Sequence, residues 1–179
     1  MNSLAEQIIV DILAQEMGLS PQNVWVRDQN LKIPNTKDLF AVVGMVDSKV
    51  IAVNKQEVPI TTPKDTLLEK MMVVTKDNIQ IDIFSYTTEA ITRRWEVLAA
   101  LASTYSVQKQ EECDFKIFRI PANFVNSSAA EGGSNLNRFS LTIACHVWYR
   151  KEKALSRNKI FDKFDGRVDD EQTIGTADP

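Results

Sequence analysis

The stretch NIQIDIFSYTTEAITRRWEVLAALASTY, residues 78–105, predicts a strand that leads into a helix. Ile79, Ile81 and Ile83 alternate with polar residues, a pattern typical of a strand that is buried on one face. Residues 85–88 then supply hydroxyl groups that can cap the start of a helix. From there to about Val107 the apolar residues recur at three- and four-residue steps, which predicts one helix packed on its own sheet. The expected apolar stripe consists of Ala90, Ile91, Trp95, Leu98, Leu101, Ala102 and Tyr105.

Before this stretch the sequence predicts one helix, a short strand and a hairpin. Residues 4–17 form an amphipathic pattern, and Gly18 is suited to end that helix in a left-handed conformation. Residues 24–26 predict a short strand. Residues 39–46 and 49–53 predict a hairpin that turns at Asp47 and Ser48, with Gly44 marking a bulge or a close backbone approach. Residues 54–63 are polar and contain two prolines, so we expect an exposed loop there.

The rest of the chain predicts further strands separated by polar connections. Residues 67–75 have strand character, and residues 76–78 are either a turn or part of one long strand that reaches Phe84. We expect polar connections at 108–114 and 123–137 and a strand at 115–120. Residues 139–149 alternate most regularly, which predicts one buried face. The predicted fold is therefore an α+β domain over residues 1–150, with a mostly antiparallel sheet and two main helices on one face.

The composition is that of an ordinary globular domain. The chain has 179 residues, 44% of them hydrophobic, and a formal net charge of −3. That charge argues against tight generic binding to nucleic acid. No apolar run is long enough for a membrane span, and the acidic N-terminal segment is unlike a secretory signal. Cys113 and Cys145 are expected to be reduced, with Cys145 acting as a small buried apolar group.

No pattern of catalytic or metal-binding residues is present in the sequence. His146 is the only histidine, and its neighbour Cys145 points to the opposite face of the expected strand, so the two cannot easily share a metal. Asp47, Asp77 and Asp82 occur singly, without a spacing that pairs carboxylates. Trp95 and Trp148 are expected to be core residues or interface anchors. We therefore predict no catalytic residue, no cofactor and no metal site.

The last part of the chain has a different composition. Residues 151–179 are mostly charged, which predicts an arm that leaves the domain. Ile160, Phe161 and Phe164 form an apolar group within it that would be exposed on an isolated subunit. The group either docks into a neighbouring subunit, giving a ring of head-to-tail contacts, or folds back on its own sheet. Phe124 and Val125 are apolar residues near the start of the expected 123–137 loop, and we expect them to contact a partner.

Taken in order, these elements resemble the tail terminator, or tail-to-head joining, family of tailed-bacteriophage neck proteins. The resemblance covers residues 4–150 and rests on the helix at 4–17, the segments 79–85 and 88–95, and the closing strand at 137–143. It implies a homo-oligomeric ring, a hexamer, that stops growth of the tail tube and joins it to the head connector or head-completion protein. DNA would pass through the lumen without specific binding, and a net charge of −3 agrees with such transit.

The resemblance also implies a place and excludes some roles. The protein would be assembled in the bacterial host cytoplasm and located in the virion, and the family brings no catalytic residues to carry over. One alternative is another tail, connector or baseplate subunit with the same kind of domain. A further alternative is a small enzyme or ligand-binding module, for which we would expect a pocket lined by Asp82, His146 or Arg94.

Overall fold

The structure is a computed structural model that describes residues 5–27, 36–60, 66–131 and 134–156. It is an α+β fold, as the sequence predicts. The elements, in chain order, are α1 (Ala5–Glu16), the 3-10 helix η1 (Pro21–Asn23), β1 (Val24–Val26), β2 (Phe40–Ile60), β3 (Thr66–Ser85), α2 (Glu89–Leu101), α3 (Thr104–Glu112), β4 (Phe115–Arg119), β5 (Val125–Asn126), β6 (Ala129–Glu131) and β7 (Ser134–Ser156).

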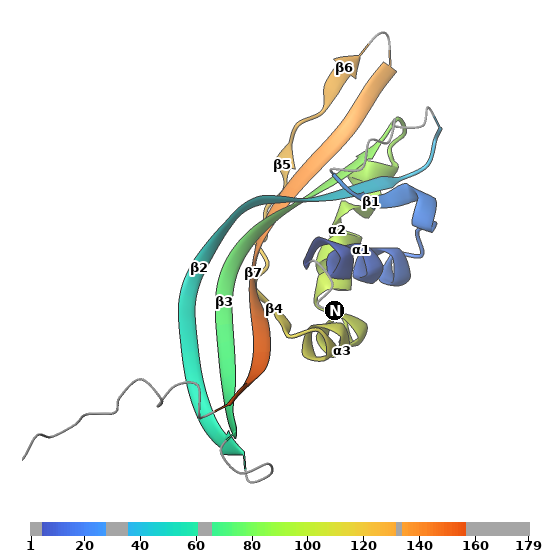
Figure 1. Ribbon diagram of the computed structural model, residues 1–179. Coiled ribbons are helices and arrows are strands. Elements are labelled where there is room, and N and C mark those ends of the chain that lie inside the picture. The colour runs from blue at the N-terminus through green and yellow to red at the C-terminus, as the bar shows by residue number, and fades with distance from the viewer. Residues whose placement is uncertain (1–4, 28–35, 61–65, 132–133, 157–179) are drawn as a thin grey trace, which may run out of the picture. The chain divides into compact units, whose positions relative to one another are not determined.

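The strands form a mixed sheet in the order β1-β2-β3-β7-β4. β1 pairs with β2 in parallel, whereas β4, β5 and β6 each pair with β7 in antiparallel fashion. β2, β3 and β7 run in alternating directions in Figure 1. The prediction of a mostly antiparallel sheet is therefore confirmed, with the β1–β2 pair as the parallel exception.

By spatial contacts the chain divides into two compact units. Unit 1 consists of Met1–Asn54 and Met72–Arg150, and unit 2 of Lys55–Met71 with the chain from Lys151 onward. In unit 2, Lys55 pairs with Glu69 at 3.0 Å and Lys70 with Glu152 at 3.1 Å. The lysine side chains of both pairs are exposed, and ion pairs to such lysines stabilise a fold only weakly.

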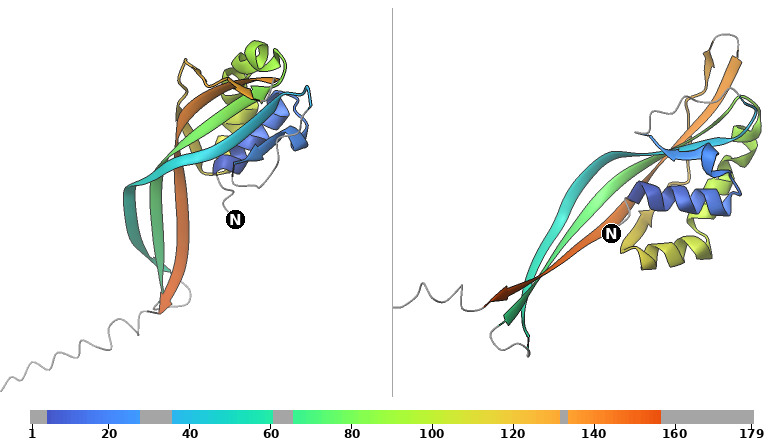
Figure 2. Two further views of the ribbon diagram at one scale, coloured as in Figure 1. Left: turned by 90° about the horizontal axis from the view of Figure 1, so that it is seen from above. Right: turned by 45° about the vertical axis from the view of Figure 1, so that its right-hand side comes forward.

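The main core of unit 1 lies between the sheet and its helices. The helices α1, α2 and α3 lie on one face of the sheet, as Figures 1 and 2 show. Ile79, Ile81 and Ile83 of β3 are completely buried in this core, which confirms the alternation predicted for that strand. The alternation of β7 is confirmed as well, because Phe139, Leu141, Ile143, Cys145 and Val147 are all buried.

The single long helix predicted after residue 88 is wrong, because the helix breaks at Ala102 and Ser103. Ser103 has an extended backbone, and its Oγ accepts a hydrogen bond from the backbone N of Ser106 at 3.0 Å. A serine in this position caps a new helix rather than continuing the old one. The expected polar connection at 108–114 is accordingly mostly helical, since α3 extends to Glu112.

The apolar stripe predicted for α2 is rotated in the structure. Ala90 and Leu101 are buried as expected, but Val97 and Ala100 complete the buried face, while Ile91 is 39% and Trp95 50% exposed. Arg93 provides one reason, because its Nη2 donates to the carbonyl oxygen of Met17 at 2.8 Å and so faces the end of α1.

The hairpin predicted at Asp47 and Ser48 is also wrong, because β2 continues through both residues. Asn78 Nδ2 donates to Asp47 Oδ1 at 2.6 Å, and Ser48 Oγ donates to Asp77 Oδ1 at 2.5 Å. Both polar side chains are thus satisfied by β3, and the strand does not need to turn. Residues 54–60 belong to the same strand rather than to the predicted loop, whose last residues, 61–63, lie outside the described part of the chain.

Other boundaries follow from these long strands. Of the two alternatives at residues 76–78, the one long strand is confirmed, since β3 runs from Thr66 to Ser85 without a turn. The loop predicted at 123–137 instead contains β5, β6 and the start of β7.

Gly18 has a φ of +61°, which confirms the left-handed end of α1.

Candidate functional site

A buried aspartate connects three segments of unit 1 on the face of the sheet opposite α1, α2 and α3. Asp82 of β3 is 2% exposed, and its Oδ2 accepts hydrogen bonds from Arg27 Nη2 and Arg138 Nη2, both at 2.8 Å. Its Oδ1 accepts from Gln80 Nε2 at 2.7 Å and from Ser140 Oγ at 2.5 Å. Arg27 follows β1, whereas Arg138 and Ser140 belong to β7, so this carboxylate connects segments that are far apart in sequence.

These contacts determine the charge of Asp82. Burial alone would raise the pKa of its carboxyl group, but the hydrogen bonds from Ser140, Gln80 and Arg138, together with the charge of Arg138, bring the pKa below its ordinary value. The carboxylate is therefore ionised at neutral pH. Its two oxygens already accept four hydrogen bonds, which is the full acceptor capacity of a carboxylate. Asp82 is thus saturated by the protein itself, which suits a structural clamp and not a general base.

Gly44 makes room for the arginine that reaches this clamp. A Cβ atom at Gly44 would lie 2.8 Å from Arg27 Cβ and 2.9 Å from Arg27 Nε, closer than non-bonded atoms normally approach. The close backbone approach predicted at Gly44 is therefore confirmed. Glycine is required here because the Arg27 side chain passes directly over it on the way to Asp82.

Aromatic side chains lie on the same face of the sheet as Asp82. Phe40 stacks on Phe84 with ring centroids 5.6 Å apart, and Trp25 meets both rings at 5.7 and 6.1 Å. Leu136 completes this small second core. The cluster and the clamp together bury part of the sheet face that the helices leave uncovered.

A second aromatic group is exposed on the helix side. Trp95 of α2 meets Phe124 edge to face, with ring centroids 5.5 Å apart. The guanidinium of Arg94 lies 5.0 Å from the ring centre of Trp95 and 4.6 Å from that of Phe139. Trp95 is half-exposed, and its ring is in contact with both Phe124 and Arg94. We call Ile91, Trp95 and Phe124 the Trp95 group.

The sequence-predicted interface residues have different outcomes. Phe124 is partly buried against the core and lies in the Trp95 group. Val125 is exposed in β5, where it pairs with Ser140 and so lies on the opposite face of the sheet, with Asp82. Ile160, Phe161 and Phe164 lie outside the described residues. Their predicted role therefore stays a prediction, as does that of the arm at 151–179.

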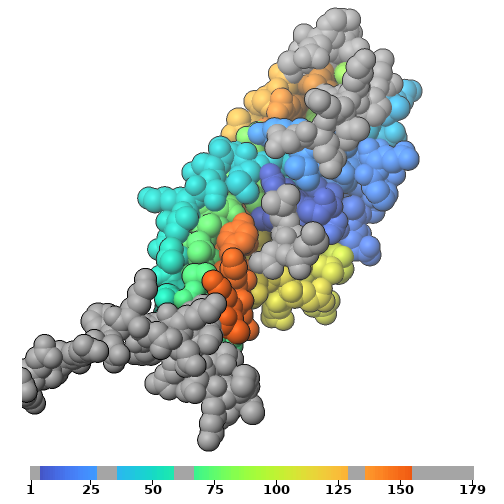
Figure 3. Space-filling model, in the orientation of Figure 1, coloured from blue at the N-terminus to red at the C-terminus, as the bar shows by residue number. Residues whose placement is uncertain are grey.

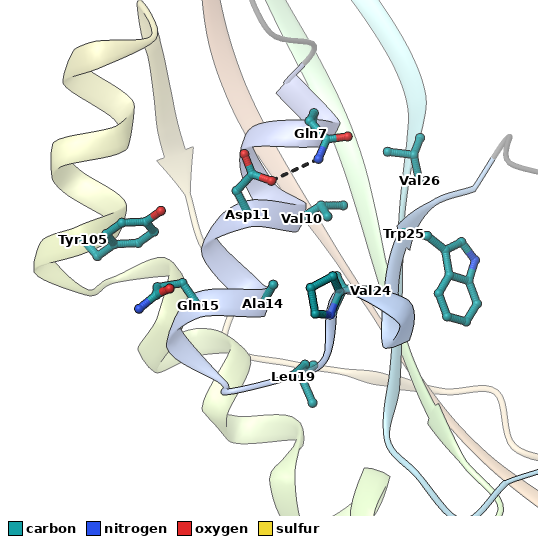
Figure 4. Close-up of a pocket in the computed structure, with 11 residues that line it drawn as sticks. Gln7, Val10, Asp11, Ala14, Gln15, Leu19, Val24, Trp25, Val26 and Tyr105 are labelled. Carbon is teal, nitrogen blue, oxygen red and sulfur yellow. Dashed lines mark hydrogen bonds between the residues drawn. The ribbon is translucent and has the colours of Figure 1, made fainter.

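One surface pocket, of about 550 Å³, lies between α1 and the segment that leads into β1 (Figure 4). Asp11 is its one carboxylate, and Gln7 Nε2 donates to Asp11 Oδ1 at 3.0 Å. The Trp25 ring points away from α1 in this view. Asp11 and Tyr105 are the two titratable side chains of this lining.

A second pocket, of about 510 Å³, lies at the opposite edge of the sheet from β2. It is lined mainly by α3, the start of β4 and the end of β7, including Val107, Phe115 and Trp148. Asp82, His146 and Arg94 line neither of these two pockets, so the lining expected for an enzyme or binding module is not found in them.

The remaining residues considered for chemistry have structural surroundings. His146 is partly exposed and stacks on Phe118, with ring centroids 5.1 Å apart. Burial raises the pKa of the Cys145 thiol to about 12, with the nearby charge of Asp77 adding to the effect. Within the described ranges, no group of three or more His, Cys, Asp or Glu side chains could hold a metal ion. None of the described helices is long and apolar enough to cross a membrane.

The outer edge of β2 is the feature that sequence reasoning missed most clearly. β1 pairs with β2 only as far as Val43, and among the described residues no other strand covers the edge of β2 on that side. From Val46 to Asn54 all side chains of β2 are exposed, and Val46, Val50, Ile51 and Val53 are between 47% and 71% exposed. The four apolar side chains were visible in sequence, but the predicted hairpin concealed that they lie on one open edge.

The partners of Asp82 were missed for a different reason. Arg27 is 55 residues and Arg138 56 residues from Asp82, so no local spacing could reveal them. Neither a scan against protein-family models nor a search of curated proteins gives a match to this chain.

Proposed function

We propose that this protein is a structural subunit of the neck of a tailed bacteriophage, where its copies close into a ring. The ring would end the tail tube and join it to the head connector, while DNA passes through the opening without specific binding. The net charge of −3 suits such passage, because a basic lumen would retain the DNA. The proposal comes from the order of the elements and is supported by the surface of unit 1.

The Trp95 group is the observation that carries the ring. Tryptophan and arginine are enriched among the residues that dominate protein–protein binding energy, especially where they are held rigid before binding. Trp95 is half-exposed yet fixed between Phe124 and Arg94, which matches that description. An anchor of this kind is suited to bind a neighbouring protein.

The second pocket is the surface on the next copy that the Trp95 group would bind. It is lined by Val107, Phe115 and Trp148 and shares no residue with the Trp95 group. When one surface of a subunit binds another surface of the next copy, the contact is head-to-tail, and such contacts close into rings. The saturated state of Asp82 favours this structural role over catalysis.

The test is the assembly state of Trp95→Ala beside the wild type. We expect wild-type protein to give a closed-ring mass by native mass spectrometry and rings with a central opening in negative-stain images. Loss of an anchor of this kind weakens a contact by about 2 kcal/mol, which raises its Kd about thirtyfold. On dilution, the Trp95→Ala assembly should therefore dissociate into subunits at a higher protein concentration than the wild-type assembly. Phe118→Ala is the matched control, because Phe118 is 66% exposed but lies outside the Trp95 group and the pocket lining. A wild type that stays monomeric at every concentration, or equal assembly of both variants, would contradict the proposed contact.

A further inference from the structure

Residues 45–51 of β2, of which 46–51 lie on its open edge, form a self-complementary sequence. They read Met45-Val46-Asp47-Ser48-Lys49-Val50-Ile51, with two apolar residues, an acid, a serine, a base and two apolar residues. The order of residue classes is the same in both directions about Ser48, except that the acid exchanges with the base. A segment of this kind matches a second copy of itself running in the opposite direction.

The edge is available for such pairing within the described part of the chain. The register of β1 with β2 ends at Val43, where Arg27 N still donates to the Val43 carbonyl at 2.8 Å. The next backbone N–H on this edge is already bonded to α1, because Met45 N donates to Glu6 Oε1 at 3.0 Å. Beyond Met45 the side chains are exposed, and in Figure 3 those of β2 (teal) lie at the surface along one border of the view.

Proteins normally protect long apolar edges of this kind. Short length, proline, bulges or several charges are the usual means, because an open edge recruits another strand. Residues 46–54 of β2 contain no proline and only two charged residues, Asp47 and Lys49. Those two charges are the ones that the self-complementary sequence pairs.

We propose that two copies of this chain pair in antiparallel fashion through β2, with a two-fold axis at Ser48. In this register Asp47 of each copy lies opposite Lys49 of the other, and Val46 lies opposite Val50. Residues directly opposite each other in an antiparallel pair are close enough for opposite charges to attract and for apolar side chains to pack. The contact is isologous, because each residue pair occurs twice.

Neighbouring registers are disfavoured by the same side chains. An axis at Lys49 places the two lysines opposite each other, and an axis at Asp47 does the same with the two aspartates. A parallel in-register pair brings like charges together along the edge. Only the axis at Ser48 satisfies both charges, which is why a second copy fits this edge better than an unrelated strand.

This contact is separate from the ring contact of the Trp95 group and does not depend on it. A two-fold contact joins two subunits, or two complete rings, whereas a ring needs the head-to-tail contact. We therefore expect Trp95→Ala to retain β2 pairing, so that one proposal can fail without the other.

The test uses charge reversal, with mixing of the variants. Asp47→Lys and Lys49→Asp should each weaken the two-fold contact by about tenfold or more, because both symmetric charge pairs become repulsive. The double variant Asp47→Lys/Lys49→Asp should recover affinity to within about threefold of the wild type, since the charges again alternate. A mixture of the two single variants should form mixed dimers, because every cross-strand pair is then opposite in charge. Sedimentation velocity and native mass spectrometry measure these outcomes.

Two controls separate pairing from folding. Asn78→Ala removes the hydrogen bond that Asn78 donates to Asp47 but keeps both charges, so the two-fold contact should be unchanged. Glu16→Lys alters net charge as much as Asp47→Lys does, at the exposed end of α1, and should have no effect. Single variants that self-associate like the wild type, or a mixture that forms no mixed dimers, would overturn the proposal.

Discussion

Replacing Asp82 with asparagine should destabilise the fold by an amount that the clamp geometry allows us to work out. Each carboxylate oxygen accepts two hydrogen bonds, two from arginines at Oδ2 and two from Gln80 and Ser140 at Oδ1. Asparagine has only one acceptor oxygen, so two of these four hydrogen bonds are lost in either orientation of the amide. Hydrogen bonds to a charged group contribute about 1.5–3 kcal/mol each, which gives roughly 3–6 kcal/mol for the pair.

Solvent reduces this figure on the arginine side. The Arg27 and Arg138 side chains are 38% and 42% exposed, so water can replace part of what the variant loses. We therefore expect Asp82→Asn to lower the free energy of unfolding by about 2–3 kcal/mol. For a chain of this size that corresponds to a fall in Tm of about 4–12 °C.

Thermal unfolding followed by circular dichroism, with urea unfolding at pH 7, measures the effect. Asp11→Asn is the matched control, since Asp11 is exposed and has one hydrogen bond within its own helix. That control should change the unfolding free energy by less than about 0.5 kcal/mol. If Asp82→Asn were as stable as Asp11→Asn, the clamp would not stabilise the fold, and the reasoning from its geometry would be refuted.

Three further predictions concern Asp82, Gly44 and the two cysteines. The stability that Asp82 contributes should depend on pH, because the pKa of its carboxyl group in the folded state lies below the ordinary 3.8. The stabilisation is present above pH 3.8 and is lost as the pH falls through the folded-state pKa. The unfolding free energies of wild type and Asp82→Asn should therefore converge in acid unfolding experiments. Gly44→Ala should destabilise by about 1–3 kcal/mol, because its Cβ would displace Arg27; wild-type stability in urea would contradict the close approach. An alkylating reagent at pH 8 should label the partly exposed Cys113 first and Cys145 only on unfolding, since burial raises the pKa of Cys145 to about 12. Peptide mass spectrometry measures the order of labelling, and early labelling of Cys145 would contradict its burial.

The periodicity of apolar residues was sufficient to predict the strands and helices that bury one side. β3 and β7 alternate because Ile79, Ile81, Leu141 and Ile143 face the helices, and α1 has a single apolar face for the same reason. Local chemistry was misleading where a distant partner decides the outcome. Asp47 and Ser48 have the composition of a turn, yet Asn78 and Asp77 hold both of them in a strand.

The candidate surfaces were predictable only in part. Trp95 was recognised as a core residue or an interface anchor, but its half-exposed position depends on Arg93 facing α1 and on the rotation of α2. The symmetry of residues 45–51 is present in the sequence, but it has meaning only when β2 is known to be an open edge. Pairing between strands is set by residues far apart in the chain, and one sequence does not reveal it.

The position of β3 between β2 and β7 has a consequence for synthesis of the protein. Contacts between segments far apart in sequence form late, because a long loop must close first. A nascent chain that has emerged as far as β3 has no β7, so the inner edge of β3 is unprotected and Asp82 has only Arg27 and Gln80 as partners. Emergence of Arg138 and Ser140 then supplies the remaining two hydrogen bonds of Asp82, and pairing of β7 with β3 covers that edge. Correct folding of the sheet thus depends on β7, the last strand in the part of the chain that the structure describes.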